Sequence, residues 1–251
     1  MNYFSIIIFL YGITLGSFYN VVGLRIPVKK SIVSPRSACT SCGHELTAWE
    51  LIPVFSYMML RGKCRQCSAR VSPLYPIMEL ITGLLFVLVY VRFDFSAEAL
   101  IGITLVSLLI IITVSDLAYM LIPDKILLFF LGLFFLEFLF LLPHHLVESV
   151  LGATVGFTLL LLISVLSKGG MGGGDIKLFA LLGFVLGVKL VLLAFFFSTL
   201  LGAIGGIVGL WLNVFKKGKP IPFGPFIATG TILVFFFHEA ILSWYFSFFI
   251  Y

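Results

Sequence analysis

Long apolar stretches, separated by short polar ones, run through most of the chain. A helix that crosses a bilayer needs roughly 20 mostly apolar residues. The pattern predicts eight such helices, at about 4–24, 76–92, 98–116, 126–142, 148–166, 175–190, 191–214 and 226–247. The boundary between the sixth and seventh is the least defined, because residues 178–214 form one apolar run interrupted only by Lys189. One helix followed by a re-entrant piece is the alternative for this run. The expected fold is all-α and polytopic.

Composition supports a membrane protein. Of the 251 residues, 61% are hydrophobic and 11% are charged, whereas soluble domains average about 45–50% and about 25%. The net charge of +5 is explained more simply by the basic loops of a membrane protein than by nucleic-acid binding. The first apolar segment lacks a basic start and a small-residue cleavage site, so we expect it to stay as a spanning helix.

Lysine and arginine are distributed unequally among the predicted loops. The first, third, fifth and seventh loops carry fourteen of the 16 basic residues, and the other loops carry only Arg92 and Lys189. Basic residues near membrane segments favour the cytoplasmic side. We therefore expect the odd-numbered loops to lie in the cytoplasm and both termini to lie outside.

The one long polar stretch, at about 25–75, contains every cysteine of the chain. These form two C-x2-C pairs separated by 21 residues: Cys39, Cys42, Cys64 and Cys67. The spacing is typical of a tetrahedral zinc site, and a reducing cytosol disfavours disulfides. Four thiolates complete the ligand set, so the metal would be structural. His44 could be a ligand only by displacing a cysteine; four unrelated buried thiols are the other alternative.

Carboxylates beside membrane segments are functional candidates, because a charge in the bilayer is costly. Asp116 ends the third predicted segment and Asp175 begins the sixth, both at the expected cytoplasmic ends. Two facing carboxyl groups that share a proton can activate water and protonate a leaving amine. Taken singly, Asp175 could be only a helix N-cap and Asp116 an interfacial loop residue. Asp124 and Glu79 are further acidic candidates for a supporting role.

Helix ends predict different roles for the two aspartates. Asp175 opens its helix, where the dipole is positive and glycine N–H groups are near, so the ionised form is favoured. Asp116 closes its helix, near the negative end. We therefore expect Asp175 to activate water and Asp116 to carry the shared proton, as a bias within a coupled pair.

Five glycines lie just before Asp175, in the segment GGMGGGD. Glycine permits positive φ and close backbone approach. A phosphate-binding loop is the rival use, but no GK[ST] is present and no strand can precede it in an all-helical protein. We expect Gly172, Gly173 and Gly174 to leave backbone open for an extended substrate strand, and we add Lys177 to the supporting residues.

At these residues the chain resembles the type IV prepilin peptidase family. The similar motifs, in the family's order, are GSFYNVVGLRIP, the paired C-x2-C loop, SPLYPIMEL, SDLAYMLIPDKI, GMGGGDIKLFALLG and IPFGPFIATG. GGGD is the G-x-G-D motif shared with presenilin-like intramembrane proteases. The resemblance implies an intramembrane aspartyl endopeptidase whose catalytic pair is Asp116 and Asp175.

The same resemblance implies the substrates: class III leader peptides of type IV prepilins, pseudopilins or competence pilins, cut on the cytoplasmic side between Gly and a hydrophobic residue. Many members also N-methylate the new amino terminus with S-adenosylmethionine. Candidates for a methyl-donor region are Gly62 and Lys63 in RGKC, and the polar residues Asn20 and Arg25. Packing or lipid contact would explain each of these four more simply.

The expected organisation is a first transmembrane helix at 1–24, a cytoplasmic zinc loop at 25–75 and a seven-helix peptidase core at 76–251, in a bacterial cytoplasmic membrane. The substrate would be captured through its leader and apolar helix, and the oligomeric state is left open. The alternative is a non-catalytic, zinc-stapled membrane scaffold or transporter. That alternative does not account for two carboxylates at matched depth beside a run of glycines.

Overall fold

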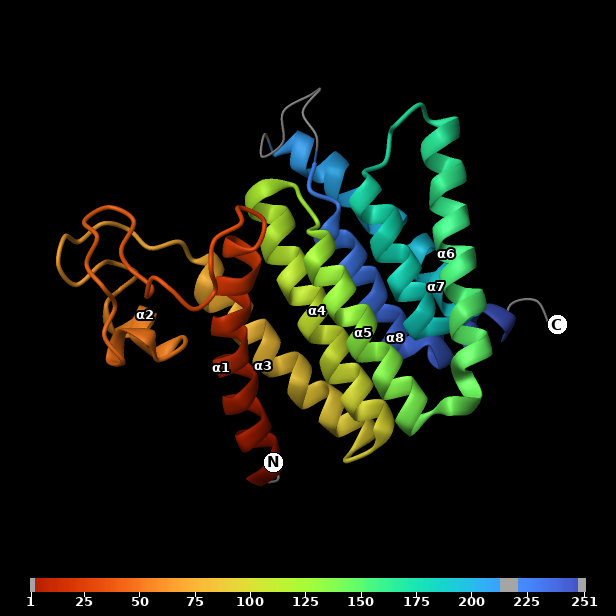
Figure 1. Cartoon of the computed structure of the whole chain (residues 1–251), viewed down its shortest axis with the longest axis horizontal. Helices are drawn as coiled ribbons and strands as arrows, with labels where there is room; N and C mark the ends of the chain where they lie inside the picture. Colours follow the sequence, from red (N-terminus) through yellow and green to blue (C-terminus); the bar gives the residue numbers. More distant parts are fainter. Residues whose placement is uncertain (1–2, 213–220, 248–251) are drawn as a thin grey trace. The chain divides into compact units, whose positions relative to one another are not determined.

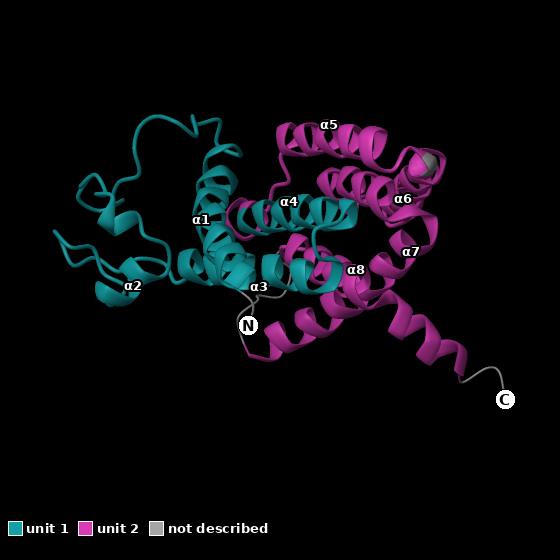
Figure 2. Ribbon diagram, turned by 90° about the horizontal axis from the view of Figure 1, so that it is seen from below, with its two compact units in different colours: residues 1–114 teal, residues 115–251 magenta. Residues whose placement is uncertain are grey.

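The structure is a computed structural model that describes residues 3–212 and 221–247. Across these two ranges the secondary structure is helical, with two isolated β-bridges and no longer strand. The all-α prediction is therefore confirmed. The chain forms two compact units, residues 1–114 and 115–251, which Figure 2 distinguishes by colour.

The first unit contains α1 (Tyr3–Arg25), α3 (Leu74–Phe93) and α4 (Ala97–Tyr119) as far as residue 114 (Figure 1). Glycines allow α1 and α3 to approach closely, since a Cβ added at Gly12 would lie 2.8 Å from the Cα of Gly83. A buried hydrogen bond of 2.7 Å joins Tyr19 of α1 to Ser107 of α4. Between α1 and α3 the chain forms the cysteine loop, with the short helices η1 (Trp49–Leu51) and α2 (Phe55–Met59).

The second unit contains the last residues of α4, then α5 (Asp124–Leu141), η2 (Pro143–His145), α6 (Leu146–Leu166), α7 (Gly173–Trp211) and α8 (Gly224–Ser247). Helices α6 and α7 pack backbone against backbone. A Cβ at Gly152 would overlap the carbonyl of Gly183, and a Cβ at Gly156 would overlap that of Phe179. Small residues four apart are a common way for membrane helices to pack.

Six helices of the described chain are long and apolar enough to cross a membrane: α1, α3, α4, α6, α7 and α8. Helix α5 has 18 residues but carries Asp124, Lys125 and Glu137. The count therefore differs from the eight predicted, but the sixth and seventh predicted segments correspond to the two parts of the 39-residue α7, which meet at a kink at Gly187.

Helix α7 is broken at Gly187, two residues before Lys189 and close to the boundary that the apolar pattern indicated. Gly187 has φ 73 and ψ 178, a conformation that is not helical and that glycine adopts most readily. A side chain here would also crowd α6, because an added Cβ would lie 3.0 Å from Oε1 of Glu148. Hydropathy does not detect such a break. The lysines at 216, 217 and 219, assigned to the seventh loop, lie outside the described residues.

Candidate active site and metal centre

Asp116 lies in the last turn of α4 and is only 6% exposed. Its Oδ2 accepts a hydrogen bond of 2.7 Å from the backbone N–H of Gly224, the first residue of α8. A Cβ added at Gly224 would lie 2.9 Å from both Cβ and Oδ2 of Asp116. The carboxyl group is therefore held against a helix N-terminus, at a distance that only glycine permits.

Asp175 lies in the first turn of α7. Its carboxyl group contacts the Gly172 backbone and is close enough to that of Asp116 to interact electrostatically. The structure thus brings together the two aspartates that the sequence nominated. Each now faces a helix N-terminus, Asp175 its own and Asp116 that of α8. The helix-end argument for different roles considered only each residue's own helix, so it no longer distinguishes the two.

The three glycines before Asp175 have different surroundings. A Cβ at Gly172 would lie 3.1 Å from Oδ2 of Asp175, and a Cβ at Gly174 would lie 2.8 Å from Cβ of Ile122. At Gly173 an added Cβ would meet nothing within 4 Å. In this run only Gly169 has a positive φ, of 89°. Gly174 is thus required for space, whereas a side chain at Gly172 would press only on the end of the Asp175 carboxyl group.

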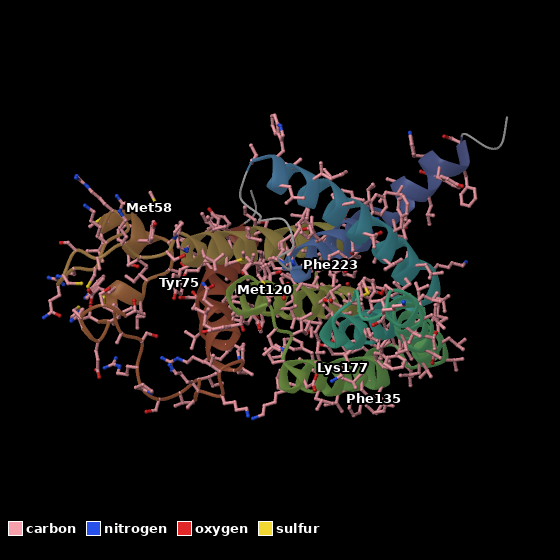
Figure 3. All side chains as sticks on the ribbon, turned by 90° about the horizontal axis from the view of Figure 1, so that it is seen from above. Met58, Tyr75, Met120, Phe135, Lys177 and Phe223 are labelled. Atoms are coloured by element: carbon pink, nitrogen blue, oxygen red, sulfur yellow. The ribbon has the colours of Figure 1, made fainter. Side chains whose placement is uncertain are left out.

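Asp124 and Lys177 form an ion pair beside these residues. Lys177 Nζ lies 2.8 Å from both carboxylate oxygens of Asp124, and both side chains are more than half exposed. Lys177 on α7 is labelled in Figure 3, with Met120 and Phe223 in the segments that precede α5 and α8. Two of the expected supporting residues are therefore partners of each other.

Glu79 belongs to the first unit, in α3, and is 6% exposed. Its Oε2 accepts a hydrogen bond of 2.7 Å from the N–H of Val54. Val54 is a β-branched residue with φ 62, a conformation that needs support from its surroundings. Glu79 also has a side-chain hydrogen bond with Ser17 of α1. It therefore contacts both α1 and the cysteine loop, where it supports a strained turn at the start of α2.

Sequence reasoning missed Gly224, Ser115 and Ile122. The motif that contains Gly224 was noticed, but no residue in it was assigned. The dipeptide Gly224–Pro225 before an apolar run signals a helix start, and a helix start can hold a carboxylate. Nothing in the sequence shows which carboxylate it holds, because Asp116 lies 108 residues away.

The four cysteines come together on two turns with the same hydrogen-bond pattern. In the first turn, the N–H of Cys39 donates to the His44 carbonyl, and the N–H of Gly43 donates to the Cys39 carbonyl. In the second turn, the N–H of Cys64 donates to the Ala69 carbonyl, and the N–H of Ser68 donates to the Cys64 carbonyl. Gly43 and Ser68 both have positive φ, 74° and 57°. Each C-x2-C pair is therefore presented by one tight turn.

The thiol positions fit a tetrahedral metal ion. All four sulfur atoms lie within 4.8 Å of one another, with Cys39 3.8 Å from Cys67 and Cys42 3.9 Å from Cys64. Four sulfurs around zinc, each at about 2.3 Å, would be separated by about 3.8 Å. These separations match the zinc geometry and are far longer than a disulfide bond.

The thiols influence one another strongly. Backbone N–H groups of Cys42 and Ser41 lower the pKa of Cys39 to about 6. The pKa of Cys42 is raised to about 12: a hydrogen bond from the His44 backbone lowers it, but desolvation and the neighbouring thiols outweigh that bond. Four clustered thiols resist ionising together without a cation, and a bound metal would favour all four thiolates.

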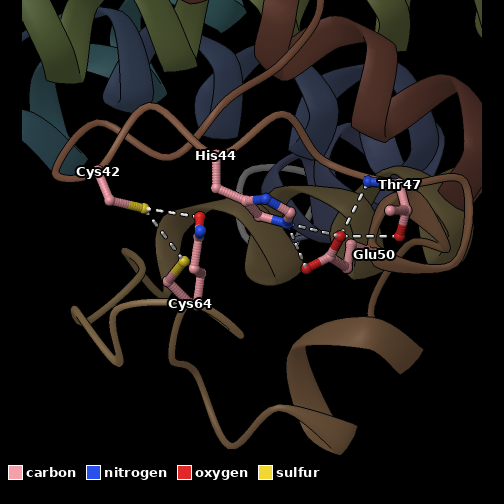
Figure 4. Close-up of polar contacts among 6 residues, drawn as sticks. Cys42, His44, Thr47, Glu50 and Cys64 are labelled. Atoms are coloured by element: carbon pink, nitrogen blue, oxygen red, sulfur yellow. Dashed lines mark hydrogen bonds and ion pairs between the residues drawn. The ribbon is translucent and has the colours of Figure 1, made fainter.

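His44 is turned toward Glu50 rather than toward the sulfurs (Figure 4). Its Nε2 lies 3.2 Å from Oε2 of Glu50, and that oxygen also accepts bonds from the N–H and hydroxyl groups of Thr47 at 2.9 and 2.7 Å. This arrangement favours the four-cysteine ligand set. It also ties the first cysteine turn to η1.

Comparisons with known proteins identify the family of the chain. A family model described as the bacterial peptidase A24 N-terminal domain matches residues 10–93, and the type IV leader peptidase family matches residues 103–207. A protein of Bacillus subtilis named prepilin leader peptidase/N-methyltransferase is 45% identical over 95% of this chain and 96% of its own. The chain belongs to the type IV leader peptidase family.

Other relatives with the same printed name support this membership. One from Aeromonas salmonicida is 35% identical over 98% of this chain and 94% of its own. One from Pseudomonas aeruginosa is 34% identical over 95% of this chain and 92% of its own. No solved structure matches the chain. The leader peptidase model spans both aspartates, whereas Gly224 lies beyond its matched residues.

The name of these relatives also includes N-methyltransferase, and the structure shows where the expected methyl-donor residues lie. Asn20 donates to the Tyr75 carbonyl at 3.2 Å, and Arg25 donates to the Ser31 carbonyl at 3.0 Å. Gly62 and Lys63 belong to the second cysteine turn, where Gly62 contacts Tyr57.

None of these contacts connects Asn20 or Arg25 with Gly62 or Lys63. Asn20 Oδ1 is buried without a partner among the described residues, but one unpaired acceptor is not a nucleoside site. The four residues do not fit S-adenosylmethionine as they stand, and we assign none of them to its binding.

Proposed function

We propose that the protein is an intramembrane aspartyl endopeptidase that removes leader peptides from type IV prepilins or related pseudopilins, with Asp116 and Asp175 as the catalytic pair. The observation that carries this proposal is the meeting of two membrane-helix carboxyl groups in a member of the type IV leader peptidase family. Such a pair has the chemistry of peptide hydrolysis.

In the proposed reaction a water molecule lies between the two carboxyl groups, which share one proton. The ionised carboxyl takes a proton from water as the oxygen attacks the scissile carbonyl carbon, and the other gives its proton to the carbonyl oxygen. The resulting diol collapses, the C–N bond breaks, and the leaving nitrogen takes a proton from the pair. The Gly224 N–H keeps Asp116 oriented throughout.

We propose that the site faces the cytoplasm of a multi-pass bacterial inner-membrane protein. Contacts within the second unit support this side. The Asp116–Gly224 and Asp124–Lys177 bonds join the ends of α4, α5, α7 and α8 that adjoin the third, fifth and seventh loops. These are loops with basic residues, which favour the cytoplasm. The termini would then lie outside.

We assign the cysteine loop a structural zinc ion held by Cys39, Cys42, Cys64 and Cys67. The proposed division is a first helix at 1–24, this zinc loop at 25–75 and the peptidase core at 76–251. Zinc would fix two turns that have little apolar core of their own. It would take no part in proton transfer, because four thiolates leave no open coordination position.

We also propose that the protein N-methylates the amino terminus that cleavage exposes. The supporting observation is the printed name of its relatives, which includes N-methyltransferase. S-adenosylmethionine would supply the methyl group. We assign no residues to its binding.

Mass spectrometry of a processed prepilin tests both activities. The substrate is a prepilin that the Bacillus subtilis relative cleaves, and that relative is the positive control. We expect the wild-type protein to remove the leader and to add the mass of one methyl group. Asp116→Asn and Asp175→Asn should each lower cleavage by at least about 1000-fold, because the two residues act as a unit.

The outcomes separate the competing functions. Robust cleavage by either variant would eliminate the dyad. A wild-type protein that leaves intact a prepilin cleaved by the relative would contradict the assigned peptidase activity and favour a scaffold or transporter. Cleavage without added methyl mass would retain the peptidase and remove the second activity.

A further inference from the structure

The segment Met120–Asp124, between α4 and α5, contacts the neighbours of both aspartates. We call it the strap. It begins where Met120, with φ 52, ends α4 and donates its N–H to the Asp116 carbonyl at 2.8 Å. A non-glycine residue with positive φ is uncommon and is maintained by the structure around it. The strap therefore starts from the backbone of Asp116 itself.

A second contact fixes this end of the strap. The hydroxyl of Ser115 donates to the carbonyl of Leu121 at 2.5 Å, and Ser115 is 0% exposed. Ser115 directly precedes Asp116 in α4. The strap is thus hydrogen-bonded to two successive residues of the helix end that presents the first catalytic carboxyl group.

The other end of the strap meets the start of α7. Ile122 is 7% exposed and packs so closely on Gly174 that an added Cβ there would lie 2.8 Å from Cβ of Ile122. Two residues later Asp124 holds Lys177 through both carboxylate oxygens, each at 2.8 Å. Gly174 and Lys177 lie one residue before and two residues after Asp175.

We infer that the strap sets the separation of Asp116 and Asp175, and that the Asp124–Lys177 ion pair locks it in position. Asp124 and Lys177 are then positioning residues for the dyad, and this inference rests on the proposed function. An exposed ion pair contributes little to global stability. This pair would act through geometry, because small displacements of catalytic groups reduce rates steeply.

Two other roles for the pair make different predictions. If Lys177 or Asp124 bound the leader peptide, its loss would raise KM. If each acted only within its own helix, as charges at the start of α5 and α7 do, the effects of removing them would be independent. If the ion pair fixes the geometry of the dyad, its loss lowers kcat. Removing both charges then costs no more than removing one of them.

A double-mutant cycle separates these roles. The full-length protein is placed in liposomes with the prepilin that the Bacillus subtilis relative cleaves. We expect Asp124→Asn and Lys177→Gln each to lower kcat about 10-fold with KM unchanged, and the double variant to lose about 10-fold rather than about 100-fold. Lys177→Arg should retain most of the rate, because it can keep the pair.

Lys125→Gln is the matched control. Lys125 is the exposed residue next to Asp124, so its substitution changes the local charge at the same helix end without removing the pair. We expect its kcat to stay within about twofold of the wild type. Multiplicative losses, an effect confined to KM, or rates for Asp124→Asn and Lys177→Gln no lower than that of Lys125→Gln would each overturn the inference.

Hydrogen exchange gives a readout that does not require cleavage. Lys177→Gln should speed amide exchange in residues 116–122, across the strap, and Lys125→Gln should not. Faster exchange confined to the start of α7 would overturn the lock even in a fully active protein. A wild-type protein that shows the exchange coupling but no cleavage would instead contradict the proposed function.

Discussion

The cysteine loop and the aspartate site are built on opposite plans. The four sulfurs come from two turns within residues 39–67, and each turn is closed by hydrogen bonds between residues four or five apart. The aspartate site joins α4, α7 and α8 through residues 116, 175 and 224. The first site is saturated by its own ligands, whereas the second must leave room for water and substrate. Residue spacing along the chain therefore predicts the self-contained cysteine site better than the aspartate site, whose residues come from distant segments.

The largest effect that would test this contrast is expected from Gly224→Ala. A Cβ at this position would lie 2.9 Å from Cβ and Oδ2 of Asp116, so either Asp116 or the start of α8 must move. We expect cleavage to fall at least about 100-fold, equivalent to about 2.7 kcal/mol of transition-state stabilisation. Initial rates on the prepilin in liposomes measure it.

Gly132→Ala is the control for that substitution. Gly132 lies in α5, where an added Cβ would meet nothing within 4 Å, and alanine favours a helix over glycine. We expect wild-type cleavage and equal or higher thermal stability. If Gly224→Ala cleaves as fast as Gly132→Ala, the close contact with Asp116 has no catalytic importance.

Substitutions of the glycines before Asp175 test the same comparison, and we expect their effects on cleavage to be somewhat smaller. Gly174→Ala forces a Cβ against Ile122 and should lower kcat by about 10- to 100-fold. Gly172→Ala presses only on the mobile end of a carboxylate and should cost less. Gly173→Ala, which has open space, should match the wild type. Equal losses at the three positions would indicate that the segment needs backbone freedom instead.

The sequence predicted most of the cysteine site, because spacing along the chain determines it. For the aspartates it could nominate residues, since charge next to an apolar helix is unusual. It could not find Gly224 or Ile122. Their importance comes from contacts between segments about 50 to 110 residues apart, and no periodicity records those contacts.

The helix boundaries also divide into those that the sequence predicts closely and those that it does not. Apolar lengths located α1 to within one residue at each end and gave the start of α7 within two. Inside α7 they placed a boundary close to Gly187, but they did not identify the residue at which the helix is broken. The conformation of a single glycine is a local feature of the backbone, and the hydropathy pattern does not contain it.

A cysteine substitution should affect cleavage less than the glycines do. Cys64 is the buried member of the four. Cys64→Ser should reduce bound zinc from about one per chain to near zero by elemental analysis, because the ligand set becomes incomplete. We expect cleavage to fall only several-fold, through altered substrate seating. Complete loss of activity in a protein whose membrane helices remain folded would place the cysteine loop within the catalytic machinery.

The smallest expected effect comes from Glu50→Gln, which removes a support of the cysteine turn without touching a sulfur. The Thr47 N–H, then the Thr47 hydroxyl and His44, lower the pKa of Glu50 below its ordinary value. The carboxylate therefore stabilises the folded loop fully above that ordinary value, about 4.3, and loses its effect as pH falls through the lowered one. Zinc release to a chelator should be about twofold faster in the variant than in the wild type. This ratio should stay the same from pH 8 to about 5.5, because Glu50 stays ionised throughout that range. A factor that already changes within that range would show that Glu50 is not the group responsible, and equal release rates would show that the zinc ion alone holds the turn.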